Sequence, residues 1–256
     1  MAIKVMFDSN VWQNVVSPED YTGDPQYAEL CKVHEKIKNG EIEPYISETV
    51  FTLENVQKKQ RKEKFGNMGS SLHTKIEEKE GGFHIRFELG PNSDEAVSLN
   101  DNPKLKKYAE KALSLGFRIV RAPRIGMFEC KDLDDKLYQV PNFNEYNEIL
   151  GEVGEKIEAH GAGKAQLDAL VSSYPGASIN ERIKAAPDTE TKKISKAIAE
   201  WADGDSVSMC IALGCDYFCS RDQARGAGTA SVMSATNMAW LEHDYGFKVV
   251  GLDVIA

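Results

Sequence analysis

The sequence predicts an α/β protein with a mostly parallel central sheet and helices on both of its faces. Two observations lead to this class. Short apolar runs have the composition of buried strands, and between them apolar residues recur with the period of a helix. Strands that alternate with helices are typical of a parallel sheet covered on both sides. The expected strands are residues 2–7, 42–46, 117–121, 216–220 and 247–251.

The segments between these strands supply the expected helices. Residues 26–39, for example, place Leu30, Val33 and Ile37 on one stripe, and Gly40 follows as a stop signal. In chain order, the expected helices are residues 26–39, 49–64, 104–115, 143–159, 165–172, 191–202 and 207–213.

The middle of the chain has a different character. Gly, Pro and Asn interrupt residues 65–102 repeatedly, and a β-hairpin is expected around residues 83–89. Residues 122–141 show no regular period and are expected to be irregular. This region therefore has the pattern of an insertion or a flap.

The composition restricts the class of protein. The chain has 256 residues, 41% of them hydrophobic, which suffices for one large domain or two small ones. No apolar stretch approaches the roughly 18 residues of a membrane span, so none is expected. Five cysteines, an odd number without framework spacing, predict reduced thiols and a cytoplasmic location. The net charge of −9 argues against a protein that coats nucleic acid non-specifically, but not against a nuclease whose acids face a metal.

Acidic residues stand where the expected strands and helices begin or end, or on an inward helix face: Asp8, Glu54, Asp203, Asp205 and Asp222. The carboxyl ends of the strands in an open α/β sheet share one edge, where ligands bind, so acids far apart in sequence can converge there. Several ionised carboxylates need cations between them, and a cluster of oxygen ligands suits Mg²⁺ or Mn²⁺. The expected chemistry is metal-assisted hydrolysis of a phosphodiester.

Four short motifs in a fixed order carry a family resemblance. They are Asp8-Ser9-Asn10, the segment from Ser47 to Glu54, Asp203-Gly204-Asp205, and Ser220-Arg221-Asp222. This order resembles the PIN domain family of metal-dependent ribonucleases, over roughly residues 1–64 and 190–256. The resemblance implies a PIN-like three-layer fold and a Mg²⁺ or Mn²⁺ site with Asn10 and Ser220 as supporting polar groups. It implies as metal ligands Asp8, Glu54, Asp203 or Asp205, and Asp222.

The sequence leaves the third acid open between Asp203 and Asp205. Asp203 keeps the spacing to the Ser220-Arg221-Asp222 motif that is usual in the family. Asp205 is better placed as an N-cap, because Gly204 is expected to end one helix before the next begins. This physical argument favours Asp205 as the ligand.

The resemblance also implies an endoribonuclease of single-stranded RNA, with a toxin-like role and an antitoxin-like or regulatory protein partner as options. A homo-oligomer is compatible with it. Compact members of the family are shorter, so residues 1–256 are expected to form a single PIN-like domain with residues 65–190 as an elaborated insertion. Basic residues that flank the acids are the expected contacts to RNA: Lys58, Lys59, Arg61, Arg221 and Arg225.

Two other classes compete with this interpretation. A PIN-like scaffold without catalysis would bind RNA or a protein through its insertion. An acid-rich phosphohydrolase would act on a small molecule, although Asp8 followed by Asn10 lacks the second Asp that such enzymes use as an acid. Taken singly, Asp8 could be a turn residue, Asp205 a plain helix cap, and Asp222 with Arg221 a surface ion pair.

Overall fold

The computed structural model describes residues 2–53, 56–68, 70–79, 82–91, 97–122, 130–221 and 231–256, with the backbone alone for the two segments between 70 and 91. Its centre is a five-stranded sheet in the order β5-β2-β1-β6-β7, and every neighbouring pair is parallel. The strands are β1 (Ile3–Phe7), β2 (Ile42–Ser47), β5 (Arg118–Val120), β6 (Tyr217–Cys219) and β7 (Val249–Val250). The predicted strands are thus confirmed, and so is the α/β class.

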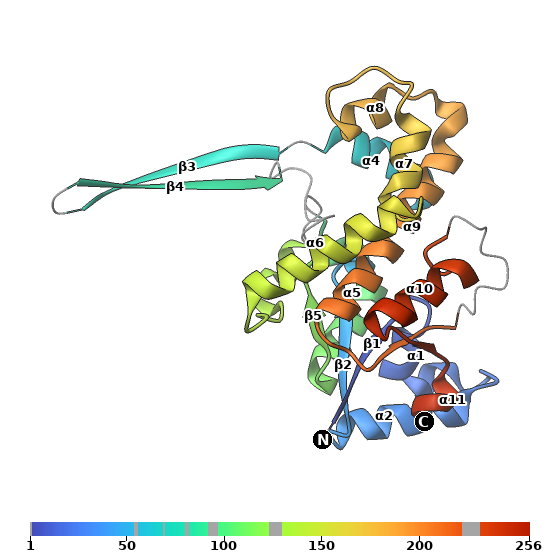
Figure 1. Cartoon of the computed structure of the whole chain (residues 1–256). Helices are drawn as coiled ribbons and strands as arrows, with labels where there is room; N and C mark the ends of the chain where they lie inside the picture. The colour runs from blue at the N-terminus through green and yellow to red at the C-terminus, as the bar shows by residue number, and fades with distance from the viewer. Residues whose placement is uncertain are drawn as a thin grey trace.

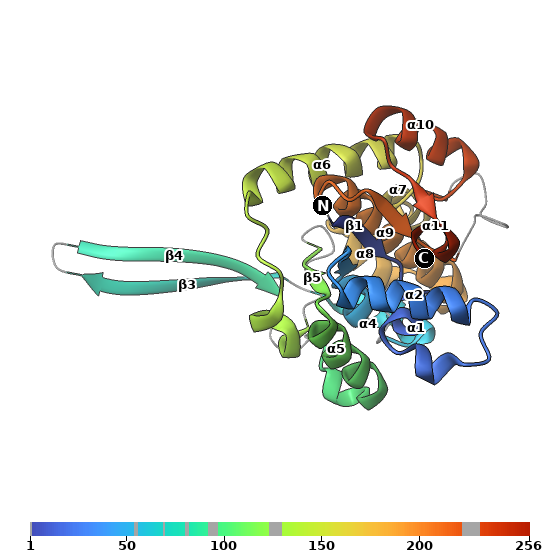
Figure 2. The same ribbon diagram turned by 90° about the horizontal axis from the view of Figure 1, so that it is seen from below.

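Helices cover both faces of this sheet, which gives three layers (Figures 1 and 2). Successive side chains of β1 pack in opposite layers, because side chains alternate between the two faces of a strand. Val5 and Phe7 belong to one buried cluster, whereas Met6 belongs to another. The first layer contains α1 (Trp12–Val16), α2 (Tyr27–Lys38), α5 (Pro103–Leu115) and α11 (Leu252–Ile255), and the second contains α6 (Phe143–Ala159), α9 (Thr191–Ala212) and α10 (Ala235–Tyr245).

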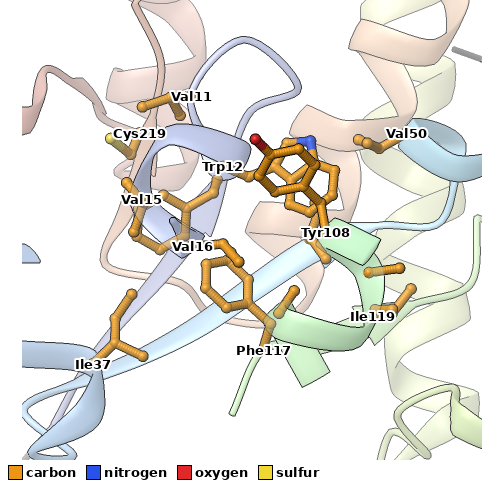
Figure 3. Close-up of a cluster of buried hydrophobic side chains, with 14 of the residues drawn as sticks. Val11, Trp12, Val15, Val16, Ile37, Val50, Tyr108, Phe117, Ile119 and Cys219 are labelled. Carbon is orange, nitrogen blue, oxygen red and sulfur yellow. The ribbon is translucent and has the colours of Figure 1, made fainter. Parts of the chain in front are cut away.

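Aromatic side chains fill the first layer (Figure 3). Trp12 is fully buried, and its ring lies 5.2 Å from that of Phe51 and 6.3 Å from that of Tyr108. Edge-on contacts of this kind add to the burial of apolar area. Trp12 follows Asp8 by one turn of chain, so this packing fixes the segment that leaves β1.

A third buried cluster joins a group of helices beyond the carboxyl ends of the strands (Figure 1). It combines α4 (Arg61–Asn67), α7 (Lys164–Val171) and α8 (Ile179–Ala185) with the first half of α9. The helix α9 therefore runs from this group of helices onto the sheet. A capping box between Ser178 and Glu181 starts α8.

A long hairpin extends away from the rest of the molecule in both views (Figures 1 and 2). It consists of β3 (Ser70–Lys79) and β4 (Gly82–Pro91), paired antiparallel so that Leu72 lies opposite Leu89 and Ile76 opposite Ile85. The expected hairpin is thus present and is longer than its predicted segment.

The expected helix over residues 49–64 is wrong. The chain forms α3 (Thr49–Thr52), becomes extended at Gln57, and continues through the short 3₁₀ helix η2 (Lys58–Gln60) into α4. No Gly or Pro marks this break in the sequence. The helix breaks because its two ends pack in different places: α3 belongs to the buried cluster of the first layer, whereas α4 belongs to the third buried cluster.

The described part of the chain also forms the short 3₁₀ helices η1 (Pro18–Tyr21), η4 (Leu99–Asp101), η5 (Lys131–Lys136) and η6 (Asp188–Glu190). Within residues 65–190 lie β5, an edge strand of the main sheet, and α6, which covers one of its faces. That the rest of this region is an insertion stays a prediction. Among the described helices, none has both the length and the apolar character needed to cross a membrane.

Candidate active site

Asp8 lies at the carboxyl end of β1, and its carboxylate accepts at least three hydrogen bonds. The backbone N–H of Ser9 donates to its Oδ1 (2.6 Å). The Nδ2 of Asn10 (2.8 Å) and the hydroxyl of Ser220 (2.6 Å) both donate to its Oδ2. Asn10 Nδ2 also lies 3.1 Å from Ser220 Oγ. The structure thus joins the first and the last of the four sequence motifs, and we call these four residues the Asp8 network.

The Asp8 network lies where the strand order of the sheet reverses. The chain leaves β1 for β2 on one side of it and later returns to β6 on the other side. The Asp8 N–H donates to the carbonyl of Cys219 in β6, at 2.9 Å. In open α/β sheets the connections diverge at such a point and leave a crevice at the carboxyl ends of the strands, where ligands bind.

Arg221 ties this network to the chain before α2. Its N–H donates to Asn10 Oδ1 (3.0 Å), and its Nη1 donates to Asp24 Oδ2 (2.8 Å). Burial tends to raise the pKa of Asp24, but the N–H of Gln26 and the Arg221 guanidinium outweigh it and leave the pKa lowered. Asp24 was missed in the sequence analysis, because its only local signal is that of a turn residue before a helix.

Asp8 and Asp203 line the same cavity, which we call the Asp8 cavity. Its volume is about 200 Å³, and Lys58 and Arg61 line it as well. Asp203 is exposed and projects from α9. The cavity also carries the hydroxyl groups of Ser9, Ser47, Thr49 and Ser206. Two acids and two cations from three separate segments therefore line one cavity at this end of the sheet.

Asp205 is not the helix cap that the sequence predicted. The helix α9 is continuous over Thr191–Ala212, and Gly204 lies inside it. A Cβ at Gly204 would lie 3.3 Å from the Cα of Gly163, so this glycine permits close packing of two backbones instead of ending a helix. The predicted break is therefore wrong.

Asp203 and Asp205 face different parts of the molecule. On an α-helix, side chains two positions apart in the sequence point in directions that differ by about 200° around the helix axis. Asp205 is only 2% exposed, whereas Asp203 is exposed and lines the same cavity as Asp8. Burial, and then the charge of Asp205, raise the pKa of Tyr146 on α6, which places Asp205 at the interface between α6 and α9. The geometry groups Asp203, and not Asp205, with Asp8.

Glu48 is a second acid at the carboxyl edge of the sheet and, unlike the half-buried Asp8, it is buried. It follows β2 as Asp8 follows β1, and it is 3% exposed. Its Oε2 lies 3.4 Å from Arg121 Nε, and its N–H donates to the carbonyl of Val120. Glu48 was not among the predicted site residues, because an acid at the start of a helix is explained by the helix dipole. Its position directly after a strand was the signal that could have singled it out.

Three predicted site residues, Glu54, Asp222 and Arg225, lie outside the described residues. Within the described ranges, no group of three or more His, Cys, Asp or Glu side chains is close enough together to hold a metal ion. The convergence of four acids stays a prediction. The acidic and hydroxyl side chains of the Asp8 cavity offer only oxygen atoms, which fits Mg²⁺ or Mn²⁺ and not a soft metal.

We compared the chain with protein-family models, curated proteins and solved structures, and none of them matches it. Functional inference therefore depends on the site itself.

Proposed function

We propose that this protein is a metal-dependent endoribonuclease with a PIN-like fold, which cleaves phosphodiester bonds of single-stranded RNA. One observation carries the proposal. Asp8, held by Asn10 and Ser220 at the reversal point of the sheet, shares a cavity with Asp203 and with cationic side chains. Acids for a metal and cations for a phosphate thus occur together at the edge where α/β proteins bind ligands.

The residues of the cavity have distinct proposed roles. Asp8 and Asp203 would hold Mg²⁺ or Mn²⁺, together with Glu54 and Asp222 as the family resemblance implies. A bound ion lowers the pKa of a coordinated water and offsets charge on phosphate oxygens. Asn10 and Ser220 orient the Asp8 carboxylate by donating to one of its oxygens.

Cationic side chains admit a polyanion to an acidic site. Lys58 and Arg61 line the cavity, and Arg61 is anchored there by a bond from its Nε to the Val56 carbonyl (3.4 Å). They lower the electrostatic cost of bringing a phosphate near two carboxylates. Arg221 is committed to Asp24, so its proposed part is to position the Asp8 network.

The biological setting is part of the same proposal. All five cysteines are free, which supports a cytoplasmic location. An antitoxin-like or regulatory protein as partner rests on the family resemblance alone.

A catalytically inactive scaffold is the second candidate, and one observation favours it. Protein donors already take at least three of the roughly four acceptor positions of the Asp8 carboxylate. A carboxylate satisfied in this way can serve to connect β1 with β6. A thermal shift on adding Mn²⁺ separates the candidates, because a metal site stabilises the folded protein by mass action and a scaffold stays unchanged.

The decisive experiment is cleavage of a pooled RNA library with Mg²⁺, with Mn²⁺ and with EDTA, followed by mapping of the new ends. The proposal expects metal-dependent products from the wild type and none from Asp8→Asn. Cleavage that persists in EDTA, or in Asp8→Asn, would point to a contaminating nuclease and contradict the proposal.

A further inference from the structure

A second, larger hollow adjoins the Asp8 cavity. It has a volume of about 570 Å³, and we call it the basic groove because five cations line it. One wall is η2 with the start of α4, and the other is the first part of α9, which lies more than one hundred residues later in the chain. The cations of the groove are Lys58, Lys59, Arg61, Lys192 and Lys196.

One stripe of α9 lines both hollows without interruption. Lys192, Ser195, Lys196 and Ala199 line the basic groove, and Ala199 and Asp203 line the Asp8 cavity. These positions recur at intervals of three and four residues, so they share one face of the helix. Lys58 and Arg61 line both hollows on the opposite wall. The path from Lys192 to Asp203 is about 16 Å long, at 1.5 Å per residue.

The four lysines of the groove are exposed, although the positive charge of Lys196 partly offsets the burial that raises the pKa of Glu200, one turn along α9. Lys58, Lys59, Lys192 and Lys196 are exposed, and none of them forms an ion pair within the described part of the chain. Among the described lining residues the acid is Asp188, whose Oδ1 lies 2.8 Å from the Nζ of Lys62 and whose charge is offset by it. The chain carries nine more acidic than basic residues, so acids are available to pair with these lysines elsewhere in the fold. A cluster of lysines without ion pairs therefore indicates a site for an external anion.

The size and the lining of the groove indicate what kind of anion. A hollow of about 570 Å³ suits a ligand of drug-like size, so it admits a few nucleotides of one strand and not a duplex. Hydroxyl groups of Thr189, Thr191 and Ser195 add hydrogen-bond donors for phosphate oxygens. No aromatic side chain is among its described lining residues, so these residues contact phosphate and offer no surface for base stacking.

We infer that the basic groove binds the phosphate backbone of a single-stranded nucleic acid, without regard to base sequence, and leads that strand to Asp8 and Asp203. The inference rests on the proposed function for the identity of the site at the end of the path. It adds Lys192 and Lys196 on α9 to the flank already expected at Lys58 and Lys59. Sequence preference then arises outside the groove.

The test measures binding apart from cleavage. Binding of a fluorescein-labelled single-stranded RNA is followed by anisotropy in EDTA, over a series of salt concentrations. The variant is Lys192→Ala with Lys196→Ala, and both positions are exposed on α9, where alanine is a good helix former. The matched control is Lys32→Ala with Lys248→Ala, two exposed lysines outside the groove that change the net charge equally.

The expected result is weaker binding of the groove variant on RNAs of every sequence. The slope of log K against log salt should become shallower by about 1.4, or about 0.7 for each lost phosphate contact. The control should keep the affinity and slope of the wild type. Equal salt slopes for the wild type and the groove variant would overturn the inference. So would a wild type that binds duplex RNA as tightly as single-stranded RNA.

The same variants separate this inference from the proposed function. If the groove variant binds RNA weakly but the wild type cleaves nothing with Mg²⁺ or Mn²⁺, the groove stands and the nuclease proposal fails. If Asp8-dependent cleavage is present and the groove variant binds and cleaves as the wild type does, the groove inference fails alone.

Discussion

The hydroxyl of Ser220 donates a 2.6 Å hydrogen bond to Oδ2 of Asp8, which joins the carboxyl ends of β6 and β1. These two residues are far apart in the sequence, and their contact fixes the candidate site at the point where the sheet reverses its order. The Asp8 side chain is thus both a candidate metal ligand and a connection between two strands.

The two roles of Asp8 predict a double effect of Asp8→Asn. We expect loss of metal-dependent RNA cleavage together with a loss of about 1–3 kcal/mol in the free energy of unfolding. An amide accepts at only one of its two positions, so it cannot satisfy Ser9, Asn10 and Ser220 at once.

Urea unfolding and a cleavage assay on the same preparation check this prediction. Ser220→Ala is the control, because it removes one donor and keeps the carboxylate. It should cost about 1 kcal/mol and reduce cleavage without abolishing it. Wild-type activity in Asp8→Asn would show that Asp8 binds no catalytic metal.

Asp203 and Asp205, both on α9, should differ in their roles: Asp203 should be needed for activity and Asp205 for stability. Asp203→Asn should lose cleavage and keep the unfolding free energy of the wild type, because the side chain is exposed in the Asp8 cavity. Asp205→Asn should alter stability and leave most of the cleavage, because Asp205 is buried against α6.

Cleavage at saturating Mn²⁺ and thermal unfolding of both variants decide the assignment. The reverse pattern, with activity lost only in Asp205→Asn, would show that the geometry of α9 misleads about the ligand.

Gly204 should be needed for close packing against Gly163 and not for ending a helix. Gly204→Ala gains about 1 kcal/mol of helix propensity, but its Cβ would lie 3.3 Å from the Cα of Gly163, and overpacking costs about 1–3 kcal/mol. We therefore expect a net loss of stability.

Gly151→Ala provides the matched comparison inside α6, where nothing lies within 4 Å of an added Cβ. This change should stabilise the protein by about 0.5–1 kcal/mol. Thermal unfolding of the two variants checks both signs, and a more stable Gly204→Ala would mean that α9 and Gly163 separate easily.

The Asp24–Arg221 pair should give the protein an acid-sensitive contribution to stability. The folded pKa of Asp24 is lowered from its ordinary 3.8, against the effect of burial, by Gln26 and Arg221. A lowered folded pKa means that this contribution is fully present above pH 3.8 and is lost as the pH falls through the folded value.

Unfolding of the wild type and of Asp24→Asn over a range of pH tests this sign. The difference in unfolding free energy should be constant near neutral pH and should shrink only below about pH 4. A difference that grows as the pH falls would contradict the lowered pKa.

Local patterns were sufficient for most of the fold. Apolar runs such as residues 3–7 are buried in any sheet, and the helical period of Phe143–Ala159 gave α6 with its observed ends. The helix predicted over residues 104–115 ends where expected, and Gly116 follows it in a left-handed conformation, which glycine adopts without strain. The position of Asp8 at a strand end followed from the same local signals.

By itself, then, the sequence determined the parallel sheet, the layers on its two faces and the position of Asp8. Only the tertiary structure decided the meaning of Gly204, since a glycine that ends a helix and one that lets two backbones approach look the same in sequence. The helix α9 continues through Gly204 at the point where Gly163 approaches it, and the phase of that helix places Asp203 in the lining of the Asp8 cavity and buries Asp205. The physical reason is that a helix period depends on neighbours in the chain, whereas the choice between two acids depends on contacts with distant segments.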